Sequence, residues 1–114
     1  MADCLFCAIV AGDVEADVVH SGDNVLAFRD INPQAPVHIL IIPKEHIESA
    51  KAIRDRNGGL LAEIFQAAGH LAKAEGVDRI GWRLVTNVGE QAGQSVHHLH
   101  FHLLGGRLMK WPPG

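Results

Sequence analysis

Histidines alternate with hydrophobic residues in one run of this chain, and this pattern constrains the local structure more than any other feature. The run is SVHHLHFHLL, residues 95–104. Because successive side chains of a strand point to opposite faces, the alternation predicts a strand with two unlike faces. The imidazole face carries His98, His100 and His102. The apolar face carries Leu99, Phe101 and Leu103.

A row of imidazoles has two chemical uses near pH 7, where an imidazole with a pKa of about 6.5 is largely neutral. It can hold a transition metal, or one ring can attack an electrophile while its neighbours orient it and donate protons. Repulsion between imidazolium ions keeps most of such a cluster unprotonated, which slightly favours the nucleophile. Surface histidines without a role are the least favoured interpretation, because ordinary binary patterning does not produce this spacing.

Length and charge exclude several classes of protein. With 114 residues, 47% of them hydrophobic, the chain is predicted to form one compact domain over residues 1–114. Ten Lys and Arg against 13 Asp and Glu, without a long basic run, argue against nucleic acid or an anionic membrane as a partner. The sequence has neither a long apolar stretch nor the start of a secretory signal, so we expect a cytoplasmic protein.

The two cysteines of the chain, Cys4 and Cys7, are separated by two residues. In a reducing compartment this spacing indicates metal binding or redox chemistry before a structural disulfide. The pair alone is too few for a zinc site, which takes about four ligands. Small buried apolar side chains are the alternative interpretation.

The remaining pattern predicts an α+β fold, an antiparallel sheet of about five strands with one long helix and a short N-terminal helix. Apolar residues in steps of three and four predict the long helix over residues 60–75, and the short one is expected over residues 4–10. Residues 45–52 are a further candidate for a short helix. Strands are predicted over residues 18–20, 25–29, 37–42 and 82–88, followed by the histidine strand. Before that strand, residues 89–94 form a glycine-rich loop whose N–H groups can cradle an anion such as phosphate.

Several segments together resemble the histidine-triad family, in which histidines alternate with hydrophobic residues. The resemblance is carried by HLHFHLL (98–104), FRDINPQAPVH (28–38), IPKEH (42–46), GQSV (93–96) and GGRLMKWPPG (105–114). The WPPG ending favours the branch of histidine-triad nucleotide-binding proteins that act as purine nucleoside phosphoramidases. The resemblance therefore implies a histidine-triad fold that pairs across a homodimer.

This resemblance implies hydrolysis of the bond between the α-phosphorus of a purine nucleoside monophosphate and a nitrogen. His100 would attack phosphorus and form a nucleotidyl-histidine, which water then resolves. His98, His102 and His38 would complete the imidazole network. Ser95 would bind the phosphate and supply a proton to the leaving amine.

Other functions remain open. A dinucleoside polyphosphate hydrolase and a noncatalytic nucleotide-binding regulatory module are the alternatives to the phosphoramidase. The phosphoramidase requires no cofactor for catalysis. A metalloenzyme whose metal is held by the three alternating histidines would instead lose its activity on chelation.

The resemblance also implies a set of nucleotide-binding residues. Asp30 would accept hydrogen bonds from the ribose hydroxyls, and Asn87 would bind near the phosphate and ribose. The apolar clamp on the purine would consist of Phe6, Ile9, Phe28 and Ile31. The loop residues Gly93, Gln94 and Ser95 would hold the phosphate, and the tail with Trp111 would reach toward the active site of the partner in the homodimer. Core packing is the alternative for each apolar residue taken alone.

The two termini carry further implications of the resemblance. In some bacterial members of the wider family a cysteine pair and two histidines hold a structural zinc, which makes Cys4, Cys7, His46 and His98 a candidate tetrahedral set. Alternatively, His98 belongs wholly to the catalytic network. Residues 105–114 are expected to form a tail near the homodimer interface, because an exposed indole before two prolines is better docked than solvated. A frayed end is the alternative.

Overall fold

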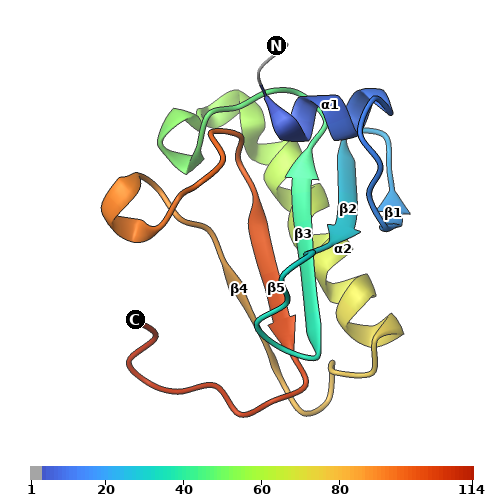
Figure 1. Ribbon diagram of the computed structural model, residues 1–114, viewed down its shortest axis with the longest axis vertical. Helices are drawn as coiled ribbons and strands as arrows, with labels where there is room; N and C mark the ends of the chain where they lie inside the picture. The colour runs from blue at the N-terminus through green and yellow to red at the C-terminus, as the bar shows by residue number, and fades with distance from the viewer. Residues whose placement is uncertain (1–3) are drawn as a thin grey trace.

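Five strands form one antiparallel sheet in the order β1-β2-β3-β5-β4, and one long helix, α2, covers a face of it (Figure 1). The computed structural model describes residues 4–114. The strands are β1 (Val18–Ser21), β2 (Val25–Arg29), β3 (Val37–Pro43), β4 (Trp82–Val85) and β5 (Phe101–Gly105). The helices are α1 (Leu5–Ala11) and α2 (Gly58–Ala74), with short 3-10 turns η1 (Ala50–Ala52), η2 (Asp55–Asn57) and η3 (Glu90–Ala92).

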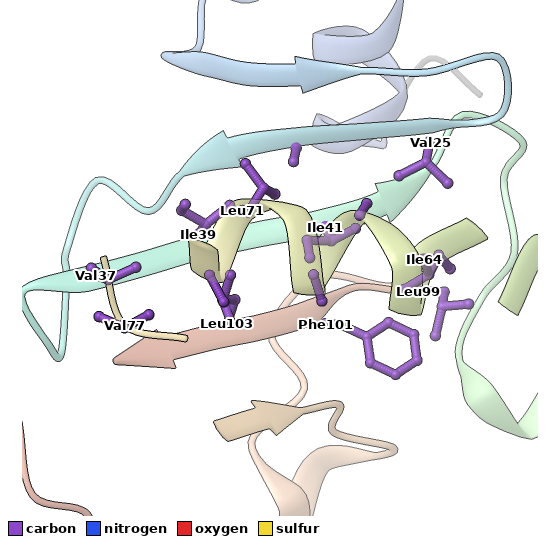
Figure 2. Close-up of a cluster of buried hydrophobic side chains, with 14 of the residues drawn as sticks. Val25, Val37, Ile39, Ile41, Ile64, Leu71, Val77, Leu99, Phe101 and Leu103 are labelled. Carbon is purple, nitrogen blue, oxygen red and sulfur yellow. The ribbon is translucent and has the colours of Figure 1, made fainter. Parts of the chain in front are cut away.

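Strand β3 is the centre of the sheet and is buried along its whole length. Its run of β-branched residues suits a strand with neighbours on both sides and apolar layers on both faces. On the α2 side, Ile39 and Ile41 pack with Ile64 and Leu71 of the helix, as Figure 2 shows. This layer is the main hydrophobic core.

A second, smaller apolar cluster lies on the opposite face of the sheet. Phe6 of α1 packs there against Phe28 of β2 and against Leu40 and Ile42 of β3. Helix α1 lies at the end of the sheet where β3 ends (Figure 1). The two faces of the sheet are therefore covered unequally, by a long helix on one side and a short one on the other.

The α+β fold, the short first helix and the long second helix are confirmed, and the three strands between them begin at the predicted residues. Helix α1 ends at Gly12, whose φ of 83° is the left-handed conformation that glycine adopts without strain. Helix α2 starts two residues before the predicted residue 60, at Gly58, and ends one residue before the predicted residue 75.

The predicted helix over residues 45–52 is wrong, because only η1 is helical there. In a helix, the backbone carbonyl groups of this segment would accept hydrogen bonds from N–H groups of the same segment. Here two of them accept hydrogen bonds from another segment instead. The Ile47 carbonyl accepts from the backbone N–H of Leu99 at 2.6 Å, and the Glu48 carbonyl accepts from the Gln94 side-chain amide at 2.9 Å. Hydrogen bonds from the loop that precedes β5 thus hold this segment in an irregular conformation.

Two predicted strands are shorter than expected. Strand β4 ends at Val85, and β5 begins only at Phe101, so the first residues of the histidine run lie outside the ladder. The backbone N–H of Leu99 binds the connection after β3 rather than a neighbouring strand. No helix in the described part of the chain has the length and apolar character needed to cross a membrane.

Replacing Ile64, which is fully buried between α2 and the sheet, with alanine should lower the free energy of unfolding by about 2–5 kcal/mol. The loss combines removed apolar contacts with the cavity that remains. Urea denaturation followed by circular dichroism measures it. Ile31→Ala is the matched control, because the Ile31 side chain is fully exposed and its removal should change the free energy of unfolding little.

Candidate active site and metal centre

The three alternating histidines lie on the sheet face opposite α2, while their apolar neighbours join the core beneath that helix. His98 and His100 are almost fully buried. The ring of Phe6 packs edge-on against both, with ring centroids 5.9 Å and 5.1 Å away. The two-faced pattern read from the sequence is therefore confirmed, although part of it lies outside the regular strand.

His100 has a fixed tautomer. Its Nδ1 lies 2.6 Å from the backbone carbonyl oxygen of His98. A carbonyl oxygen only accepts hydrogen bonds, so Nδ1 carries a proton, and in the neutral ring Nε2 keeps its lone pair. The carbonyl of His100 in turn accepts from the Thr86 hydroxyl at 2.8 Å. Thr86 was missed in the sequence, where nothing marks it beyond its place after a predicted strand.

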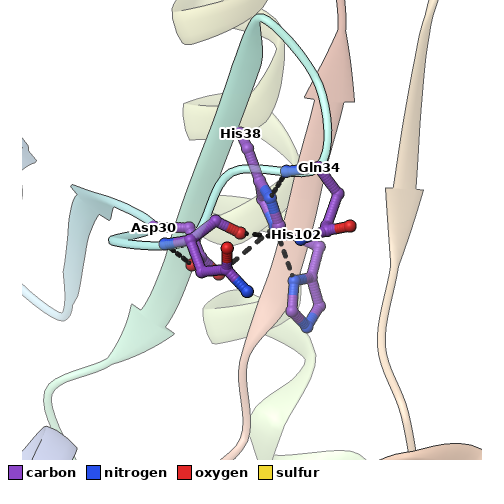
Figure 3. A network of polar contacts seen from close by, with 5 residues as sticks. Asp30, Gln34, His38 and His102 are labelled. Carbon is purple, nitrogen blue, oxygen red and sulfur yellow. Dashed lines mark hydrogen bonds and ion pairs between the residues drawn. The ribbon is translucent and has the colours of Figure 1, made fainter.

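A second pair of imidazoles, His38 and His102, forms a directed relay (Figure 3). The His102 ring lies beside that of His100, with centroids 5.1 Å apart. The backbone N–H of Gln34 donates to His38 Nδ1 at 3.0 Å, so the proton of neutral His38 is on Nε2. His38 Nε2 lies 2.9 Å from His102 Nδ1 and 3.4 Å from Asp30 Oδ2. His102 therefore accepts at Nδ1 and carries its own proton on Nε2. The role of the Gln34 backbone was not predicted, because it depends on how the loop before β3 folds back.

Burial keeps these rings neutral. Desolvation lowers the pKa of His38 and of His98 below the ordinary histidine value. Desolvation, with repulsion from His100 and His38, lowers the pKa of His102 to about 4, against a smaller raising effect of Asp30. Near pH 7 the tautomers assigned to His38 and His102 are therefore those of uncharged imidazoles.

A cavity of about 330 Å³ opens beside His100 and His102. The structure brings eight of the predicted nucleotide-binding and catalytic residues together at this cavity. They are Phe6, Ile9, Phe28, Asp30, Ile31, Ser95, His100 and His102. Its walls also include Leu40 and Val96. Leu40 pairs with His102 across β3 and β5, so alternation along the predicted β3 strand could have placed it on this face.

Other predicted residues lie outside the cavity wall. The buried Gln94 side chain is used within the loop, accepting from the Gly89 N–H and donating to the Glu48 and Val96 carbonyls. Gly93 ends η3 with a φ of 90°, and Asn87 is half-buried beyond the end of β4. The Trp111 ring is 82% exposed in the tail, with Arg83 placed 6.0 Å from its centroid.

The four residues of the candidate metal set converge. Cys4 Sγ lies 3.3 Å from His98 Nδ1, and Cys7 Sγ lies 3.3 Å from His46 Nδ1 and 3.6 Å from His98 Nδ1. Zinc–sulfur and zinc–nitrogen bonds of about 2.3 Å and 2.0 Å at a tetrahedral angle separate the two ligand atoms by about 3.5 Å. The spacing and the donor atoms therefore fit a tetrahedral zinc.

The tautomer of His98 also fits a role as a zinc ligand. Its Nε2 lies 2.8 Å from the Pro43 carbonyl oxygen, so Nε2 carries the proton and Nδ1 offers its lone pair to the cysteines. Both ring nitrogens of His98 are thus directed away from the cavity, and only its carbonyl reaches His100. His98 contacts His100 through its backbone carbonyl, whereas its ring faces the candidate metal set.

A metal between the alternating histidines does not fit. Among residues 4–114, the groups of possible ligands are the cysteine set and the trio Asp30, His38 and His102. In the trio, the Gln34 N–H places the proton of neutral His38 on Nε2, the atom that faces the other two members. The three alternating histidines direct their Nδ1 atoms to three different partners.

The lowered pKa of His102 gives the fold a pH-dependent stability. Unfolded histidine titrates near pH 6.5 and folded His102 near 4, so the unfolded chain binds more protons between these values. The free energy of unfolding contributed by His102 is therefore complete above about pH 6.5 and is lost as the pH falls toward 4. The pKa difference corresponds to about 3 kcal/mol, which solvent screening of this partly exposed ring reduces to on the order of 2 kcal/mol. Urea unfolding at pH 5 and pH 7.5 should give a smaller difference for His102→Gln than for the wild type. Equal differences would contradict the assignment.

Comparison with known proteins identifies the family. The family model described as "Scavenger mRNA decapping enzyme C-term binding" matches residues 3–110. A "14 kDa zinc-binding protein" of Brassica juncea is 46% identical over 98% of this chain and 100% of its own. A HIT family hydrolase from Legionella pneumophila is 54% identical, with a TM-score of 0.96 over 98% of this chain and 100% of its own. A hypothetical histidine triad nucleotide-binding protein from Sulfolobus tokodaii is 31% identical, with a TM-score of 0.79 over 96% of this chain and 72% of its own. With this agreement of sequence, fold and histidine geometry, the chain belongs to the histidine-triad (HIT) family.

Proposed function

We propose that this protein is a purine nucleoside phosphoramidase, which hydrolyses the phosphorus–nitrogen bond of nucleoside 5'-phosphoramidates or adenylylated amines. The observation that carries the proposal is the tautomer of His100. With its Nδ1 proton bound to the His98 carbonyl, the ring presents an unprotonated Nε2 as the nucleophile of the adjoining cavity. The HIT family hydrolase that this chain resembles supports hydrolysis in general.

The cavity suits a nucleoside monophosphate. Its apolar wall, with Phe6, Ile9, Phe28 and Ile31, can enclose a base. Asp30 has carboxylate oxygens at the edge of the same cavity to accept from ribose hydroxyls. The phosphate would lie toward the other end, between the loop of Gly93, Gln94 and Ser95 and the imidazoles, with Asn87 near it. The nucleotide-binding name of the Sulfolobus tokodaii relative supports this class of ligand.

Each step of the reaction has a group of this chain to carry it. His100 Nε2 attacks the α-phosphorus, a bond from nitrogen to phosphorus forms, and the bond to the leaving amine breaks. The amine leaves as a neutral molecule because the Ser95 hydroxyl, exposed at the cavity, passes it a proton. His102, with its proton on Nε2, donates to a phosphate oxygen, and the His38 relay holds it in that tautomer. Water then attacks phosphorus and gives up a proton that returns to the Ser95 oxygen, while the bond between His100 Nε2 and phosphorus breaks. The nucleotide leaves, and both His100 and Ser95 are restored.

Incubation with adenosine 5'-phosphoramidate tests the chemistry. His100→Ala should lower kcat at least about 1,000-fold, because the covalent path is lost. Rapid acid quench of the wild type with labelled substrate should trap a nucleotidyl-histidine. His97→Ala is the matched control, because His97 is exposed and outside the cavity wall. Equal turnover by wild type and His100→Ala would falsify the mechanism.

The same assay separates the two alternatives. A dinucleoside polyphosphate hydrolase would cleave diadenosine polyphosphates with a higher kcat/KM than the phosphoramidate. A noncatalytic regulatory module would bind AMP but hydrolyse neither substrate. The geometry favours an enzyme over a module, because a binding site does not need the Nδ1–H contact that leaves His100 Nε2 free.

We also assign the cysteine set to a structural zinc, held by Cys4, Cys7, His46 and His98. Two thiolates and two imidazoles at tetrahedral spacing are a closed set without an open position for substrate. The zinc would supply conformational stability, and the chemistry above does not pass through it. The zinc-binding name of the Brassica juncea relative supports the assignment.

A homodimer is the proposed assembly of this single-domain chain. Strand β4 is an edge strand, and Trp82 at its start is partly exposed. Ile80, which is two residues before Trp82, is also exposed, and so are Leu108 and Trp111 in the tail. An unpaired edge with exposed apolar side chains is suited to pairing with a second copy. Residues 105–114, which lead away from β5 on the β4 side (Figure 1), would then lie near the interface.

The double substitution Trp82→Glu with Leu108→Glu should shift the protein from dimer to monomer, because it places charges on the apolar edge. Analytical ultracentrifugation between about 1 and 100 μM measures the shift, a range that brackets the dissociation constants of modest interfaces. Val18→Glu, at an exposed position of the opposite edge strand β1, is the control and should remain dimeric. A monomeric wild type would refute the assembly.

A further inference from the structure

We infer that the metal set controls the affinity of the nucleotide cavity through helix α1, so that Cys4, Cys7 and His46 are positioning residues for the purine wall. Loading of the site fixes α1 against the sheet. Loss of loading weakens nucleotide binding and raises KM but leaves kcat nearly unchanged. The kinetic part of this inference depends on the proposed phosphoramidase activity, whereas the binding part does not.

Helix α1 contributes residues both to the metal set and to the cavity wall, and these residues lie in the same two helical turns. Cys4, its N-cap, and Cys7 supply half of the metal set. Leu5, Phe6 and Ile9 line the cavity. The ring of Phe6 also packs against His98, a ligand of the set, and against His100. Any shift of α1 relative to the metal set therefore moves one wall of the cavity.

The polar attachment of α1 to the sheet runs through its thiols. Within the described range 4–114, the hydrogen bonds that residues 4–11 make to other elements join Cys4 to His98, and Cys7 to His46 and His98. The backbone groups of α1 bond within the helix or to the turn that follows it. Of its side chains, only Phe6 is buried.

An isolated helix of this length has little stability of its own. It has seven residues, whereas isolated helices below about 12 residues are marginal in water. Its first turn has no acidic residue and its last turn has no basic residue. Its N-cap is Cys4, whose sulfur accepts from the Cys7 N–H at 3.3 Å. The cap of the helix is thus itself a metal ligand, and loss of the metal weakens cap and attachment together.

The hydrogen bonds that fix the tautomer of the proposed nucleophile, His100, come from outside α1, although Phe6 of α1 also packs against its ring. The ring of His98 is anchored to the Pro43 carbonyl at 2.8 Å, and the next residue, Leu99, is anchored to the Ile47 carbonyl at 2.6 Å. These bonds fix the His98 carbonyl that sets the His100 tautomer. The Thr86 hydroxyl binds the His100 carbonyl from the other side. The chemistry at His100 is therefore expected to survive a displacement of α1.

The size of the effect follows from the population of the docked helix. If α1 is docked in a tenth of the metal-free molecules, the apparent Kd for AMP rises about tenfold. The bound state itself is unchanged, so a saturated enzyme turns over at its normal rate. This split between KM and kcat distinguishes positioning of the wall from a direct role of the metal in catalysis.

The test uses the full-length protein loaded with Zn²⁺, the same protein after chelation, and His46→Ala. His46 belongs to the metal set but lies outside both α1 and the cavity wall. His70→Ala, at an exposed position of α2, is the matched control. Calorimetric titration with AMP gives Kd, hydrogen exchange followed by mass spectrometry reports on residues 5–11, and adenosine 5'-phosphoramidate gives kcat and KM.

We expect about a tenfold weaker AMP affinity and faster exchange confined to residues 5–11 in the chelated protein and in His46→Ala. Added Zn²⁺ should restore the chelated wild type, a readout that stands even if His46→Ala fails to fold. An unchanged Kd, faster exchange throughout the sheet, or a wild type that binds no Zn²⁺ would each refute the inference. A large fall in kcat at constant Kd would refute it as well. Absence of turnover in the wild type would reject the phosphoramidase, while Kd and exchange would still decide the role of α1.

Discussion

The hydrogen bond from His100 Nδ1–H to the carbonyl of His98 is the contact on which the proposed chemistry depends. At 2.6 Å it fixes which nitrogen of His100 is free. The donor and acceptor are only two residues apart, but the bond forms because His98 is immobilised by its own ring. That ring is held on one side by the Pro43 carbonyl and on the other by the two cysteines. One residue thus joins the metal set, the end of β3 and the nucleophile.

This order of hydrogen-bond donors and acceptors depends on the low polarity around the imidazole rings. The imidazoles are largely buried on the sheet face opposite α2, where desolvation lowers the pKa of His38, His98 and His102. A protonated His38 or His102 would break the order of donors and acceptors that begins at the Gln34 N–H. Burial makes protonation of these rings cost folding stability. It therefore keeps His38 and His102 in the neutral tautomers that the proposed nucleophilic mechanism requires.

Short helix α1 gives the site a feature that the sheet cannot supply. Strands β3 and β5, with the residue just before β5, contribute Leu40, His102 and His100 to the cavity wall, whereas α1 contributes Phe6 and Ile9. Because α1 is attached by its thiols, one buried ring and the partly buried Ile9 and Val10, we infer that its position is more adjustable than that of the strands. Under the proposed function, substrate recognition and chemistry would thus rest on elements of unequal stability.

Much of this could be predicted from the chain alone. The two-residue period of the histidine run determined which side chains face the core, and the three-four steps of residues 60–75 determined the long helix, because both periods are local properties of the backbone. Together with the resemblance, they also named most residues of the cavity wall. Local pattern failed for residues 45–52, whose carbonyls bind Leu99 and the Gln94 amide from a loop about 50 residues away in the chain.

Only the tertiary structure decided the division of labour among the histidines. In sequence, His98, His100 and His102 are equivalent members of one alternating row. In the fold, the ring of His98 faces Cys4 and Cys7, His100 is anchored to a carbonyl, and His102 accepts from His38. The physical reason is that a tautomer is set by the partner of each ring nitrogen, and those partners come from α1, β3 and the loop before β3. The sequence determined the row of imidazoles, whereas long-range contacts determined which nitrogen of each ring is free.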